Sequence, residues 1–174
     1  MVCLNVNSVF LECLENSDPE RKLEIVRTRL EQMSNWPKEP AWRALAVFEG
    51  LLRHAAPAQL PDVISHVPVF AGNDIEVDAL AKTVFNKVAA CEVAAEKTPH
   101  GYLAQRFAVT VASPTSGRHA LITRQGESVR ILAGCFYGSR EKLERAIAEK
   151  SEDWHANGGM AHYRGVLSLA CRLG

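Results

Sequence analysis

The spacing of hydrophobic residues along the chain changes once, near residue 98. Before that point, apolar residues recur every three or four positions, which is the period of an amphipathic helix. The clearest runs are Leu23, Val26, Leu30 and Met33, and later Val77, Leu80, Ala81, Val84, Phe85 and Val88. Asp18 before Pro19 predicts a helix start, because Asp caps free amides and proline suits the first helical position. Residues 1–98 are therefore predicted to form a helical lobe.

After residue 98 the hydrophobic period falls to two. Apolar residues alternate with polar or small ones from Leu103 to Val111, which predicts a half-buried strand. Two more strands are predicted at Arg118–Arg124 and Ser128–Ala133, joined at Gly126, where a glycine suits a tight hairpin. We expect a three-stranded antiparallel meander with one face covered by helices, because a small isolated sheet is only marginally stable.

Two helices are predicted to follow the strands. Ser139 is placed to cap one that runs to about Lys150, and apolar spacing from Met160 onward predicts the other. The order of helices, strands and helices indicates an α+β fold rather than alternating β/α units. Residues 99–174 would then be the meander with its two helices, either as a second lobe or within one continuous domain.

Composition and charge limit the classes of function. The chain has 174 residues, of which 47% are hydrophobic and 23% charged, as is usual for a globular protein. Its 20 basic and 20 acidic residues cancel, which disfavours a dedicated nucleic-acid binder because such proteins neutralise phosphates with excess positive charge. A chain near zero net charge also lacks charge-based protection against association. We therefore expect a protein partner or a homo-oligomer.

The cysteines and the hydrophobic runs bear on the compartment. The five cysteines are odd in number and widely spaced, which favours reduced thiols over a disulfide framework. No run approaches 18 apolar residues, so neither a transmembrane helix nor a membrane partner is expected. The start, Met1 to Phe10, has no basic residues ahead of its apolar ones, unlike a secretory signal. We expect a cytoplasmic protein.

Cys135 is the strongest candidate for catalysis. It lies between a predicted strand and a predicted helix start, where a helix N-terminus would stabilise a thiolate. His155 and His162 follow in the sequence, and a Cys–His pair is a known nucleophile arrangement. The alternative is that Cys135 is a small apolar residue at a strand end. A small Cys/His enzyme therefore stays an alternative function.

Other groupings give weaker signals. Gly134–Arg140 would hold an anion through backbone amides and Arg140, but its spacing matches neither the P-loop nor the dinucleotide fingerprint. The six histidines contain no i, i+4 pair and the chain has no C-x-x-C, so neither a metal site nor a cofactor is predicted. An open sheet face bearing Arg106, Arg118, Arg124 and Arg130 would make a nucleic-acid-associated regulator a second alternative.

One segment resembles a known group of proteins. Gly134, Cys135, Phe136, Gly138, Ser139 and Glu141, followed by His162, Tyr163 and Arg164, match a pattern in small uncharacterised proteins encoded by phages and prophages. Their pattern is a strand ending Ala-Gly-Cys-Phe, then Gly-Ser or Gly-Thr, an acidic helix, a His and a Tyr-Arg pair. The resemblance covers about a quarter of the chain. It departs from the pattern at Leu143, where Phe is usual, and at Trp154 in the linker.

The resemblance implies a genomic setting rather than an activity. Small phage accessory proteins often bind and block a host protein, including defence machinery. The leading hypothesis is therefore a non-enzymatic inhibitor of a host protein, of the anti-defence (anti-CRISPR-like) kind. Trp, Tyr and Arg dominate interface hot spots, so we expect binding through Trp154, Tyr163 and Arg164, with Arg140 as a further binding residue.

Overall fold

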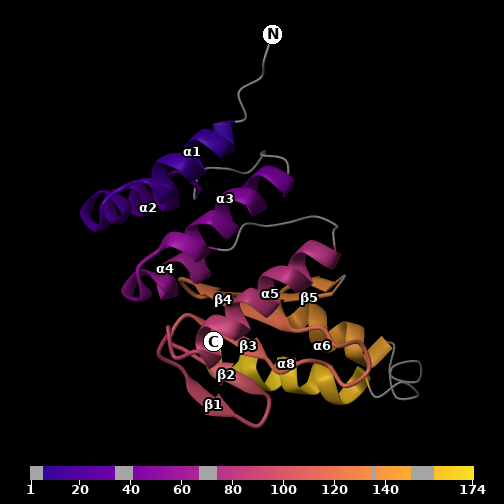
Figure 1. Ribbon diagram of the computed structural model, residues 1–174. Helices are drawn as coiled ribbons and strands as arrows, with labels where there is room; N and C mark the ends of the chain where they lie inside the picture. Colours follow the sequence, from indigo (N-terminus) through magenta and orange to yellow (C-terminus); the bar gives the residue numbers. More distant parts are fainter. Residues whose placement is uncertain (1–5, 34–40, 67–73, 135, 150–158) are drawn as a thin grey trace. The chain divides into compact units, whose positions relative to one another are not determined.

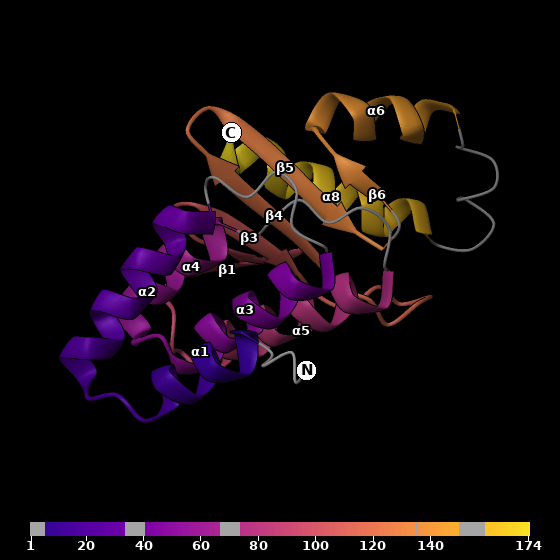
Figure 2. The same ribbon diagram turned by 90° about the horizontal axis from the view of Figure 1, so that it is seen from above.

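The protein is described from a computed structural model that covers residues 6–33, 41–66, 74–134, 136–149 and 159–174. Its helices and strands are labelled in Figure 1 and seen from above in Figure 2. The chain divides into two compact units, Met1–Val69 and Phe70–Gly174. In the described ranges, no helix has the length and apolar character needed to cross a membrane.

The first unit is helical. Its elements are α1 (Val6–Glu15), α2 (Pro19–Met33), α3 (Ala41–His54), the short 3-10 helix η1 (Pro57–Gln59) and α4 (Leu60–Ser65). Helix α3 is central, because it packs against α1, α2 and α4. Large side chains buried within this unit include Leu14, Phe48, Leu51, Leu52, Leu60 and Ile64.

The predicted start of α2 is confirmed, but one residue of its apolar run is exposed. The Asp18 Oδ1 accepts a hydrogen bond from the Arg21 N–H at 2.9 Å, so Asp18 caps the helix. Val26 is fully buried, but Leu23 is 43% exposed. Periodicity identifies the face of a helix that carries apolar residues, but how far that face is covered depends on the neighbouring helices.

The second unit is a sheet with helices. It contains α5 (Asp74–Ala89), β1 (Glu96–Thr98), β2 (Gly101–Leu103), β3 (Phe107–Thr110), β4 (Ala120–Gln125), β5 (Ser128–Ala133), β6 (Phe136–Gly138), α6 (Arg140–Glu149) and α8 (Gly159–Leu173). The six strands are antiparallel, and each pairs with the next one in sequence. Gly126, with φ 59°, begins the two-residue loop between β4 and β5, as expected for this hairpin.

The prediction of a three-stranded meander with two C-terminal helices is therefore wrong in its count. The described residues form six strands and seven α-helices, although the α+β class is correct. Strands β1, β2 and β6 have three residues each, too few to show alternation. The predicted strand from Leu103 to Val111 also contains a hairpin turn. There, the Ala104 N–H donates to the Phe107 carbonyl at 2.8 Å, and the alternation continues through the turn.

Both faces of the sheet are covered, rather than one. Helices α6 and α8 pack on one face around a core that includes Ala108, Ile122, Ile131, Leu143 and Val166. Helix α5 contacts β3, β4 and β5, and Figure 2 shows it on the side opposite α6 and α8. All four residues of β3 are buried for this reason, because a strand between two helical layers has no face left for water.

Polar contacts fix the C-terminal end of α8 to the sheet. The Arg124 Nη1 of β4 donates to the Leu173 carbonyl at 3.2 Å. The Arg172 Nη2 reaches both carboxylate oxygens of Glu96 in β1, at 3.0 and 2.9 Å. The first of these contacts satisfies a carbonyl that the end of a helix would otherwise leave open.

Candidate functional site

The predicted site residues fall into two sets. Three of them lie outside the described residues: Cys135, Trp154 and His155. The other four begin α6 or lie in the first half of α8: Arg140, His162, Tyr163 and Arg164. The pairing of Cys135 with a histidine therefore stays a prediction, and the described geometry concerns the second set.

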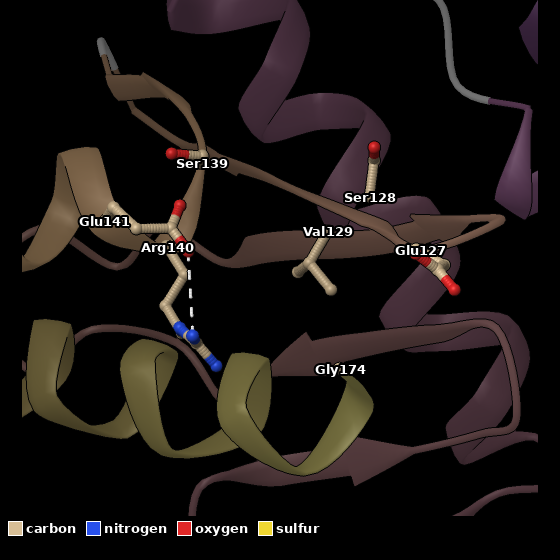
Figure 3. A pocket seen from close by; sticks show the side chains of 7 residues that line it. All are labelled: Glu127, Ser128, Val129, Ser139, Arg140, Glu141 and Gly174. Carbon is tan, nitrogen blue, oxygen red and sulfur yellow. Dashed lines mark ion pairs between the residues drawn. The ribbon is translucent and has the colours of Figure 1, made fainter.

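Arg140 lines a surface pocket of about 290 Å³. Figure 3 shows its seven lining residues, which come from the β4–β5 hairpin, the start of α6 and the end of α8: Glu127, Ser128, Val129, Ser139, Arg140, Glu141 and Gly174. The guanidinium of Arg140 forms ion pairs with Glu141 at 3.6 Å and with Glu144 at 3.7 Å. Both carboxylates belong to α6, so the charge of Arg140 is paired with residues of its own helix.

The acidic groups at the start of α6 weigh against an anion in this pocket. The Ser139 Oγ accepts a hydrogen bond from the Lys142 N–H at 3.3 Å, so the predicted cap is present and uses one of the free amides. A hydrogen bond from Ser139 lowers the pKa of Glu141, helped by the charges of Arg140 and Arg145. Glu141 therefore holds its negative charge near neutral pH, and Glu127 brings a second carboxylate to the lining.

Tyr163 and Arg164 are not among the residues that line the pocket of Arg140. Arg140 lines this pocket together with Gly174, which follows the end of α8. Arg164 lies ten residues earlier, which is about 15 Å along a helix. Tyr163 packs against the core between the sheet and α8, and its ring centroid lies 5.7 Å from that of His162. Arg164 itself is exposed.

The four arginines proposed for an open sheet face do not form one. Arg124 lies opposite Val129 on the side of α8, where it binds the Leu173 carbonyl. Arg130 lies opposite Thr123, one position along, and therefore points to the α5 side. Arg106 and Arg118 lie in the connections before β3 and β4 rather than in the strands, so the four arginines do not line one face of the sheet as expected.

Sequence reasoning missed a group of histidines at one end of the sheet. His119, just before β4, is 7% exposed, and its Nδ1 lies 2.8 Å from the Thr110 carbonyl. Its ring stacks on Phe85 of α5, with centroids 4.5 Å apart. On α8, burial first and then the charge of His119 lower the pKa of His162.

A third histidine approaches α8 from the β1–β2 turn. A Cβ placed on Gly165 would lie 3.0 Å from the His100 Nδ1, so the His100 ring rests against this glycine. In the sequence, this group of histidines is indicated by His119, a polar residue at an inward position of a period-two pattern.

Within the ranges that the structure covers, no three His, Cys, Asp or Glu side chains are arranged to hold a metal ion.

Comparison of the chain with protein-family models, curated proteins and solved structures finds no match in any of the three. The residues of the chain therefore carry the functional proposal.

Proposed function

We propose that this chain is a non-enzymatic accessory protein of phage or prophage origin that binds and inhibits a host protein in the host cytoplasm. Within that class we propose an anti-defence (anti-CRISPR-like) inhibitor. The support is the resemblance of the segment Gly134–Arg164 to small phage and prophage proteins, together with the way the fold presents the end of that segment. Figure 2 places the two helices of the segment, α6 and α8, on the same side of the sheet.

The observation that carries the proposal is the exposure of Arg164 on a firmly anchored helix. The inner face of α8 is buried through Val166, Leu169 and Ala170, so its backbone is held in place. Arg164 is exposed on this helix, and among the residues that the structure describes none forms an ion pair or hydrogen bond with it. Because the helix backbone is already fixed, binding at Arg164 costs the rotamer freedom of its side chain but no ordering of the backbone, which favours its use as an interface residue.

The chemistry of arginine indicates what a partner would offer at this position. The guanidinium donates in a planar fork that matches a carboxylate in two parallel hydrogen bonds. Tyr163 adds a ring that is already packed on the core, and Trp154 in the preceding segment would extend the contact. We therefore expect an acidic residue of the host protein against Arg164, near an apolar patch of that protein.

Capture from the bacterial host tests the proposal. The tagged chain should recover one partner in stoichiometric amount, and both Arg164→Ala and Trp154→Ala should weaken that recovery at least about tenfold, as is usual for interface hot spots. Arg27→Ala is the matched control, because Arg27 is an exposed helical arginine of the other unit. Failure to recover a stoichiometric partner contradicts the proposed function. A partner that binds both variants as well as the control contradicts only the placement of the surface.

A plaque assay tests the anti-defence proposal. In a host with active CRISPR interference, expression of the chain should restore plating of a targeted phage, and Arg164→Ala should lose that effect. A host without the defence system is the control and should show no change. If the captured partner is unrelated to defence and plating is unchanged, the anti-defence proposal is refuted. The broader proposal of an inhibitor of a host protein then still stands.

A further inference from the structure

We draw no further inference here: the strongest candidate, the surface pocket between the β4–β5 hairpin, the start of α6 and the end of α8, rests on the two exposed carboxylates of Glu127 and Glu141 beside an Arg140 that is already ion-paired within its own helix, and no other feature of the described residues points to a ligand there.

Discussion

Gly101 is a position where the structure allows only glycine, and its replacement by alanine is a sharp test of the sheet. Gly101 begins β2 opposite Thr110 of β3, with φ +148°. A Cβ built there would lie 2.1 Å from the Val109 carbonyl oxygen and 2.7 Å from the Thr110 Cα. Both atoms belong to the backbone of the neighbouring strand, so no side chain can move aside to relieve the clash.

The cost of Gly101→Ala has two parts. A sparsely populated backbone conformation costs about 1–3 kcal/mol for a residue that has a Cβ. Relief of the clash also requires β2 to move away from β3, which loses ladder hydrogen bonds of about 1 kcal/mol each. We therefore expect the free energy of unfolding of the second unit to fall by about 3 kcal/mol or more.

Urea unfolding followed by far-ultraviolet circular dichroism measures this loss. Gly117→Ala is the matched control in the same unit, because Gly117 also has a positive φ, +68°, but a Cβ there would meet nothing within 4 Å. The control should lose only the cost of the left-handed conformation, about 1–2 kcal/mol. If the two variants unfold at the same urea concentration, the close approach of β2 to β3 at Gly101 is wrong.

Two further substitutions test the layer formed by α6 and α8. Leu143 is fully buried between α6 and the sheet, so Leu143→Ala should lower the free energy of unfolding by about 2–5 kcal/mol through lost contacts and a cavity. Arg172→Ala removes the ion pair with Glu96, whose side chains are 47% and 59% exposed. The loss of unfolding free energy should stay below about 1 kcal/mol and should shrink in high salt. Urea unfolding with and without about 0.5 M NaCl measures this difference.

Long periodic segments of this fold are predictable from the sequence, and its short ones are not. The buried face of α5, with Leu80 and Val84, follows from the helical period. Strand β5 has the predicted bounds, Ser128–Ala133, because the hairpin loop that begins at Gly126 marks where the strand starts. Three-residue strands owe their existence to pairing with a neighbour, which is a tertiary effect that local sequence does not encode.

The same distinction applies to the candidate site. The predicted binding residues belong to one segment of the sequence, yet Arg140 lines a pocket with Gly174 beyond the end of α8, whereas Arg164 lies in the first half of that helix. His119 and Phe85 are distant in sequence, and their rings stack because α5 packs against the sheet at β3 and β4. Such a contact depends on burial and on packing across two elements, and neither property follows from spacing along the chain. A candidate site in this protein is therefore defined by which elements pack together.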